Sequence, residues 1–130
     1  MPDPTTGRGG ITPRMLTLVT QLQDRGWRLS CWDPHPQNPK SDHPRGRACD
    51  VFPGTTGIMP SPTEKARGDA LAAALQAGAA RIGIHYLIWS GRIWSLARDA
   101  EGWRPYNGGG VYDPASVTGG HHDHIHISIY

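Results

Sequence analysis

The chain has 130 residues, with 13 Lys and Arg against 11 Asp and Glu, which gives a formal net charge of +2 with His counted as neutral. This length suits one domain around one core. The near balance of charge, without a run of Lys or Arg, argues against nucleic acid as a partner. No apolar stretch approaches the roughly 20 residues that a bilayer requires, so we expect no membrane association. Seventeen Gly and twelve Pro predict long ordered loops.

The N-terminal part predicts a loose segment followed by a helix. Residues 1–10 are rich in Gly, Pro and Thr and are expected to form a flexible lead-in to a single domain over residues 11–130. Thr12 followed by Pro13 is typical of a helix N-terminus. Apolar residues then recur at helical spacing until Gly26, where we expect the helix to end.

Two strands and a cysteine pair are predicted next. Residues 27–32 and 48–52 read as strands, and the intervening 33–47 contain four prolines and no periodicity, which indicates an ordered loop. Cys31 and Cys49 lie in the two strands that flank this loop. We expect them to form a disulfide, with two buried thiols as the alternative.

The C-terminal half predicts one further helix and three strands. A capping-box sequence starts the helix of residues 61–81, and Ser90-Gly91 joins two strands, 84–89 and 92–95, as a hairpin. Residues 96–120 are expected to be irregular, and 124–129 alternate as a last strand. This order predicts an α+β fold: a small antiparallel sheet flanked by two main helices, with many loops.

The start of the last predicted strand and the residues before it hold the highest density of candidate functional side chains, because residues 121–126 contain four histidines and an aspartate. The two-residue period places His124 and His126 on one face and sends the isoleucines into the core. Both imidazoles can reach one metal, or one can bind while the other takes a proton from the bound water. Imidazole and carboxylate are ligands that Zn²⁺ accepts, and three of them leave a position for water.

A second stretch, residues 41–50, fits the pattern SxHxxGxAxD. Pro44 disfavours a helical conformation for His43, so we expect a loop that leads into the strand carrying Asp50. If Cys49 faces the core, Asp50 faces the opposite side of the sheet.

These two stretches together resemble the LAS metallopeptidases, the lysostaphin and D-alanyl-D-alanine metallopeptidase group that acts on peptidoglycan, in a branch common in actinobacterial secreted proteins and phages. The resemblance covers residues 11–130. It implies a Hedgehog/D-Ala-D-Ala peptidase-like fold and one Zn²⁺ held by His43, Asp50 and His126.

The resemblance leaves the general base open between two residues. Carboxypeptidase-type relatives use the acid three positions before the last ligand, here Asp123, and H-x-H relatives use the imidazole two positions before, here His124. Strand geometry favours His124, because Asp123 begins on the opposite face. His121 resembles a further active-site histidine and is expected to stabilise the oxyanion.

Substrate contacts are expected from Ser41, Trp32 and Arg92. Many relatives carry an arginine shortly after the first strand to stabilise the tetrahedral intermediate, whereas residues 31–35 contain none. Three arginines remain as candidates for that role: Arg14, Arg28 and Arg92.

The function implied is zinc-dependent hydrolysis of amide bonds in peptidoglycan peptides, by a monomer that is secreted or otherwise extracytoplasmic. The first residues lack the basic region and apolar core of a secretory signal, so either the protein stays inside its cell or, as the resemblance implies, the chain is a domain of a longer exported protein or a phage lysin. One alternative is a catalytically silent module that binds metal and cell wall. Another is a metal-dependent nuclease, which the missing basic patch disfavours.

Overall fold

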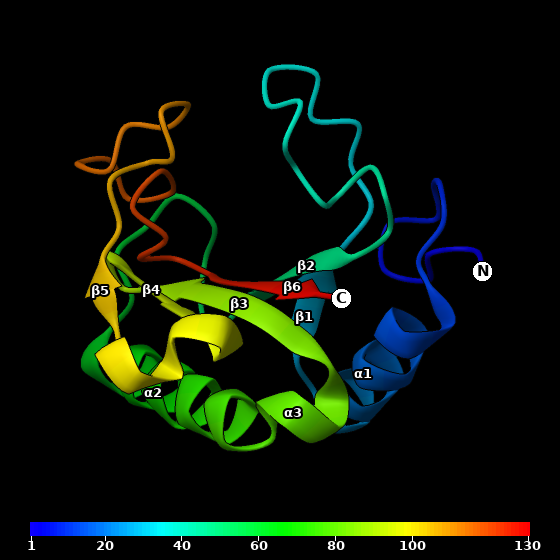
Figure 1. Cartoon of the computed structure of the whole chain (residues 1–130), viewed down its shortest axis with the longest axis horizontal. Coiled ribbons are helices and arrows are strands. Elements are labelled where there is room, and N and C mark those ends of the chain that lie inside the picture. Colours follow the sequence, from blue (N-terminus) through cyan, green and yellow to red (C-terminus); the bar gives the residue numbers. More distant parts are fainter.

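The computed structural model describes residues 1–130 and is α+β, with one open antiparallel sheet of six strands and four helices (Figure 1). In spatial order the strands are β1 (Arg28–Ser30), β2 (Ala48–Phe52), β6 (Ile125–Ile129), β3 (Ile84–Trp89), β4 (Arg92–Ser95) and β5 (Arg104–Pro105). The helices are α1 (Pro13–Asp24), α2 (Pro62–Ala77), α3 (Ala79–Ile82) and the 3-10 helix η1 (Leu96–Glu101).

The predicted helix starts are confirmed by their caps. At α1, the Thr12 hydroxyl accepts a hydrogen bond from the backbone N–H of Met15 at 3.2 Å. At α2, Ser61 and Glu64 form the reciprocal capping box that the sequence predicts. These side chains satisfy N–H groups that have no partner within the helix, so each helix begins where the sequence predicts.

The end of the second helix was predicted too far along the chain. The continuous helix expected to residue 81 is wrong, because the chain breaks at Gly78 into α2 and the four-residue α3. Glycine costs more backbone entropy in a helix than other residues do, which makes it a natural point for this break. Gly83 then ends α3 in the left-handed conformation, with φ +90°.

The hairpin of β3 and β4 is confirmed. Ser90 and Gly91 both have positive φ, +53° and +76°, as a tight two-residue hairpin turn requires. The expected strand of 27–32 is shorter than predicted, since β1 ends at Ser30. The stretch 96–120, expected to be irregular throughout, contains η1 and the short β5.

The helices cover one face of the sheet and long loops rise from the other (Figure 1). The core lies under the helices, where apolar residues of α1 and α2 pack with Val51, Leu87, Ile125, Ile127 and Ile129. Cys31 and Cys49 form the predicted disulfide and belong to this core. No helix is both long and apolar enough to span a bilayer.

The N-terminal segment folds back on itself, although residues 1–10 were expected to be a flexible lead-in. Pro2 pairs with Gly10 in an isolated antiparallel bridge, and the carbonyl of Met1 accepts a hydrogen bond from the N–H of Ile11 at 2.8 Å. Asp3 is only 1% exposed. The segment is therefore an ordered loop with a buried carboxylate.

Candidate metal centre

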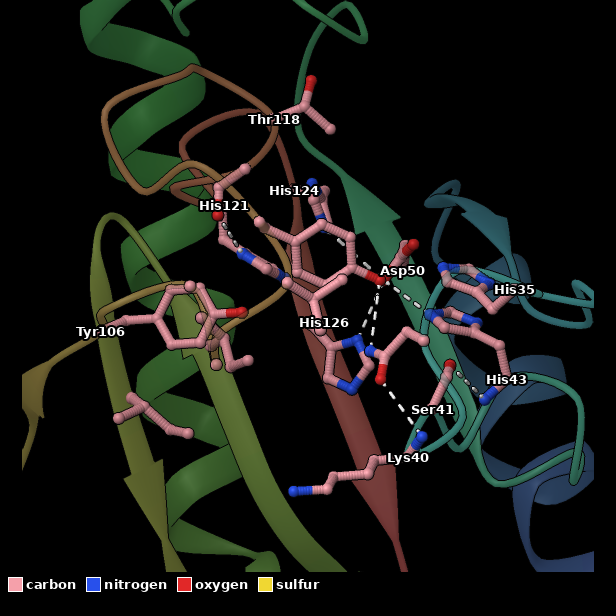
Figure 2. Close-up of a pocket in the computed structure, with 18 of the residues that line it drawn as sticks. His35, Lys40, Ser41, His43, Asp50, Tyr106, Thr118, His121, His124 and His126 are labelled. Atoms are coloured by element: carbon pink, nitrogen blue, oxygen red, sulfur yellow. Dashed lines mark hydrogen bonds and ion pairs between the residues drawn. The ribbon is translucent and has the colours of Figure 1, made fainter.

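Two of the predicted metal ligands lie opposite each other on paired strands. Asp50 of β2 is the direct partner of His126 of β6. Side chains of paired residues project from the same face of an antiparallel sheet and lie about 5 Å apart at their Cβ atoms. Cys49 is part of the core, so Asp50 faces the other side, as the sequence predicts. His43 reaches this face from the loop between β1 and β2 (Figure 2).

The donor atoms of these three residues converge. The Asp50 Oδ1 atom lies 3.4 Å from Nε2 of His43 and 3.3 Å from Nδ1 of His126. Three ligand atoms, one from each residue, all lie within 4.8 Å of one another. The structure thus brings together the three residues that the family resemblance implies as ligands.

Each imidazole is oriented through its second nitrogen. The Nδ1 atom of His43 lies 2.5 Å from the carbonyl oxygen of Cys31, which can only accept a hydrogen bond. The Nε2 atom of His126 lies 2.8 Å from the Ser128 hydroxyl. A proton on the far nitrogen leaves the near nitrogen with a lone pair for a metal, as is usual for histidine ligands.

The carboxylate of Asp50 fits a divalent cation. Its Oδ1 atom is buried and forms no hydrogen bond of acceptable geometry, even though imidazole nitrogens lie within 3.4 Å. Burial alone would raise the pKa of Asp50, but the positive charges that His124 and His43 carry when protonated in the zinc-free chain hold it well below its usual value, so the group is ionised. A buried, unpartnered carboxylate oxygen is unfavourable without a cation. Two imidazoles and one carboxylate suit Zn²⁺ and other divalent ions.

A histidine–aspartate pair lies beside this cluster. The Nδ1 atom of His124 lies 2.6 Å from Oδ1 of Asp123, and its Nε2 atom lies 3.7 Å from Oδ1 of Asp50. Asp123 is itself held through Oδ2, which accepts hydrogen bonds from the N–H of Gly57 (2.7 Å) and the hydroxyl of Thr118 (2.9 Å). Burial would raise the pKa of Asp123, but these bonds and His124 lower it to about 2. His124 therefore faces the cluster and the ionised Asp123 lies behind it.

His121 packs against His124 with ring centroids 4.4 Å apart and adopts a left-handed backbone conformation, with φ +58°. Its Nδ1 atom lies 3.3 Å from the carbonyl oxygen of Gly119. Burial first, and then the neighbouring His124 and His126, lower the pKa of His121 to about 3. The ring is thus neutral in the zinc-free chain. The oxyanion role expected for His121 from the sequence stays a prediction.

The cluster opens into a cavity of about 320 Å³. Figure 2 shows His43, His121, His124 and His126 grouped around Asp50 in this cavity. Ser41, an expected substrate contact, also lines it, and its hydroxyl accepts a hydrogen bond from the backbone N–H of His43 at 3.2 Å.

Two other expected substrate residues lie outside this cavity. Trp32 packs over Gly9, with the Arg8 guanidinium 5.4 Å from the indole centroid. Arg92 lines a separate groove with Trp89 and Trp103. The other two candidate arginines are also elsewhere: Arg14 contacts Gly83, and Arg28 stacks on Phe52. None of the cavity residues is an arginine.

Several cavity residues were not found from the sequence. His35 stacks on His43 with ring centroids 4.6 Å apart and an interplanar angle of 6°. It lies in the proline-rich loop, where no periodicity marks it. Tyr86 stacks on His126 at 5.4 Å and pairs in register with Ser128. The alternation of β3 does carry a signal for Tyr86, because it faces away from the core residue Leu87.

Comparison with known proteins gives one match. The family model described as VldE, C-terminal domain, matches residues 7–122, a range that includes His43, Asp50 and His121 and ends two residues before His124. No curated protein and no solved structure matches the chain significantly.

Proposed function

We propose, for a chain that belongs to the VldE C-terminal domain family, that it is a zinc-dependent peptidase of peptidoglycan stem or cross-link peptides. The family name states no reaction. The proposal therefore rests on the geometry of the cavity and on the resemblance of residues 41–50 and 121–126 to LAS metallopeptidases. That resemblance also suggests that the antiparallel sheet has the Hedgehog/D-Ala-D-Ala peptidase arrangement.

One observation carries the proposal. The lone-pair nitrogens of His43 and His126 and the ionised Oδ1 of Asp50 converge at the floor of a cavity, and Asp50 Oδ1 has no other hydrogen-bond partner there. Three protein donors are the number found in catalytic zinc sites, where one position stays open for water. When bound there, the ion would supply Lewis acidity, which acidifies water and polarises an amide carbonyl.

His124 is the general base of the proposed reaction. Its Nε2 atom faces the cluster and takes one proton from the attacking water, whose oxygen forms a bond to the carbonyl carbon. The Asp123 carboxylate accepts a hydrogen bond from the Nδ1–H group of His124 at 2.6 Å and stabilises the imidazolium. His124 then gives its proton to the leaving nitrogen as the C–N bond breaks. The two bases left open by the sequence thus act as a pair.

Tyr106 is the proposed donor to the oxyanion, a role for which the cavity offers no arginine. Its hydroxyl points toward the centre of the cluster in Figure 2. Burial raises the pKa of Tyr106 to about 12, so the phenol keeps its proton. Tyr106 is thus an alternative to His121 for this role, and both line the cavity.

Lys40 suggests what kind of peptide binds. It contributes the only Lys or Arg side chain to the cavity lining (Figure 2). A positive charge at the rim favours substrates with a carboxylate, which peptidoglycan stem peptides carry. The Cys31–Cys49 disulfide is consistent with an extracytoplasmic protein, where such a substrate is found.

The test is metal-dependent hydrolysis of purified muropeptides by the untagged chain, followed by mass spectrometry. We expect a chelator to abolish turnover and added Zn²⁺ to restore it. Arg92→Ala is the control, because Arg92 lies outside the cavity and should leave turnover unchanged. Turnover that survives complete removal of the metal contradicts the proposal. Sedimentation with purified wall without release of new amines identifies the silent binding module, and nicking of plasmid DNA identifies the nuclease.

A further inference from the structure

We infer that the N-terminal loop, residues 1–11, is a positioning element of the metal centre, and that Asp3 acts through Cys31 to fix the orientation of the ligand His43. The inference rests on the proposed metal centre but not on the proposed reaction. Asp3 lines no part of the cavity, so its role is to hold another residue and not to touch substrate.

The carboxylate of Asp3 organises the loop from within. Its Oδ1 accepts hydrogen bonds from the N–H and the hydroxyl of Thr5, each at 2.8 Å, and its Oδ2 accepts one from the hydroxyl of Thr6 at 2.7 Å. A fourth bond leaves the loop: the backbone N–H of Trp32 donates to Oδ2 at 2.8 Å. Such a buried acid with four donors is a specific arrangement, since an ionised carboxylate is rarely buried without partners.

The loop binds the main chain at the point where the sheet stops holding it. The β1–β2 ladder ends at the pair Ser30 and Asp50. The next two N–H groups, those of Cys31 and Trp32, donate instead to Thr5 Oγ1 (2.9 Å) and Asp3 Oδ2. Asp3 and Thr5 therefore fix the backbone of residues 31 and 32, which the sheet leaves free.

This backbone in turn orients His43. The carbonyl oxygen of Cys31 lies 2.5 Å from Nδ1 of His43 and accepts a hydrogen bond from its N–H, which leaves the Nε2 lone pair facing Asp50 at 3.4 Å. Loss of the bonds to Cys31 and Trp32 would let that carbonyl rotate. The ring of His43 would then lose both its fixed orientation and its preferred tautomer, on which metal affinity depends.

The same loop holds His43 from its other side. The N–H of Thr12, directly after the loop, donates to the carbonyl of Gly46 at 3.1 Å. Gly46 has φ +70°, and a Cβ there would lie 2.7 Å from the Cα of Ile11. The turn that follows His43 is thus packed against the end of the N-terminal loop. The loop therefore supports both the Cys31 carbonyl that contacts the His43 ring and the turn that follows His43 in the chain.

The test measures Zn²⁺ affinity of the untagged chain by competition with a chromophoric chelator. Asp3→Asn places an amide NH₂ group among the donors, and Thr5→Val removes the acceptor for Cys31. We expect each to weaken Zn²⁺ binding by about 10- to 100-fold, the range found when partners behind a metal ligand are removed. Thr5→Val decides the question if Asp3→Asn does not fold.

Two controls separate positioning from general loss of stability. Thr20→Val makes the same substitution as Thr5→Val at an exposed position of α1, where the hydroxyl donates to the carbonyl of Leu16, and Leu75→Ala destabilises the distant core of α2. Both should bind Zn²⁺ like the parent chain. Equal affinity in all variants, or equal weakening in the controls, overturns the inference.

A second readout does not need the metal. In the zinc-free chain, at a pH high enough to keep His43 neutral although Asp50 raises its pKa, ¹⁵N NMR should show His43 as a single tautomer with the proton on Nδ1, and Thr5→Val should produce a mixture of tautomers. If the parent chain binds no Zn²⁺, the proposed metal centre fails, and this spectrum alone decides the role of the loop. An unchanged His43 spectrum in Thr5→Val then refutes it.

Discussion

The two faces of the sheet differ in the side chains that the central strand β6 presents to them. Toward the helices, β6 presents Ile125, Ile127 and Ile129, which join the main hydrophobic core. Toward the loops it presents His126 and Ser128, opposite Asp50 and Tyr86. Both faces are buried, but the first is covered by helices and the second by loops that bear polar side chains (Figure 1). One face thus contributes to the hydrophobic core, and the other carries the candidate metal ligands Asp50 and His126.

The largest expected effect is on the loop-covered face. His126→Ala removes one of the three convergent donors and should abolish both Zn²⁺ binding and turnover. The zinc-free protein should keep its fold, because the isoleucine face is unchanged. Metal analysis and circular dichroism of the same sample check both statements. A His126→Ala chain that binds Zn²⁺ and turns over normally would contradict the assignment.

His124→Gln should separate catalysis from metal binding. Loss of a general base lowers kcat by about 10²- to 10⁴-fold, whereas the three converging donors remain. The measurement is kcat for a muropeptide together with bound Zn²⁺ per chain. Retention of full kcat would move the role of base to another group.

The opposite face is tested by Ile127→Ala, at the position next to His126. Ile127 is fully buried, and truncation of such a side chain lowers the free energy of unfolding by about 2–5 kcal/mol. Turnover per folded molecule should stay close to that of the parent chain. Denaturant unfolding and kinetics well below the melting temperature measure the two quantities. A large loss of kcat at full folding would show that the two faces are coupled.

The disulfide is expected to affect mainly stability. Cys31 and Cys49 are 18 positions apart, and a bridge that closes a loop of this size contributes on the order of 3 kcal/mol. Replacement of both residues by Ala should lower the free energy of unfolding by that amount. The Zn²⁺ affinity of the same double variant, compared with that of the parent chain, tests whether the bridge also holds the Cys31 carbonyl in place beside His43.

The smallest effect is the pH dependence linked to Asp3. Burial alone would raise the pKa of Asp3, but hydrogen bonds from Thr6, Trp32 and Thr5 hold it below the ordinary value of 3.8. The ionised carboxylate thus stabilises the fold fully above pH 3.8, and this contribution is lost as the pH falls through the lower pKa of the folded state.

Unfolding of the zinc-free parent chain and of Asp3→Asn, compared between pH 7 and pH 2.5, measures this contribution. The stability difference between the two should be constant at higher pH and shrink below about pH 4. A difference that grows on acidification would contradict the ionised, hydrogen-bonded carboxylate.

The features predicted well from the sequence depend on short-range signals. Caps mark the starts of α1 and α2, Ser90-Gly91 marks the hairpin, and two-residue alternation separates His126 from the isoleucines. The approach of His43, Asp50 and His126 was expected from the family resemblance of their motifs. Neither the local sequence signals nor the family resemblance shows which imidazole nitrogen faces Asp50. The contacts of His43 with the Cys31 carbonyl and of His126 with the Ser128 hydroxyl set these ring orientations, and only the structure reveals them.

The features that were missed depend on contacts between distant residues. Asp3 reaches Trp32 across 29 positions, and nothing in its own neighbourhood predicts burial. The placement of Trp32 and Arg92 away from the cavity likewise follows from packing and not from residue type. His35 could not be found because its proline-rich loop has no hydrophobic periodicity that would predict which way its side chain points.

The direct pairing of Asp50 with His126 has a consequence for how the strands find their register during folding. A shift of β6 by a single position against β2 would exchange its two sides, turning isoleucines toward the open cavity and histidine into the helix-covered interior. Only the observed strand alignment brings His43, Asp50 and His126 together, so an ion bound there would stabilise this register against the shifted one.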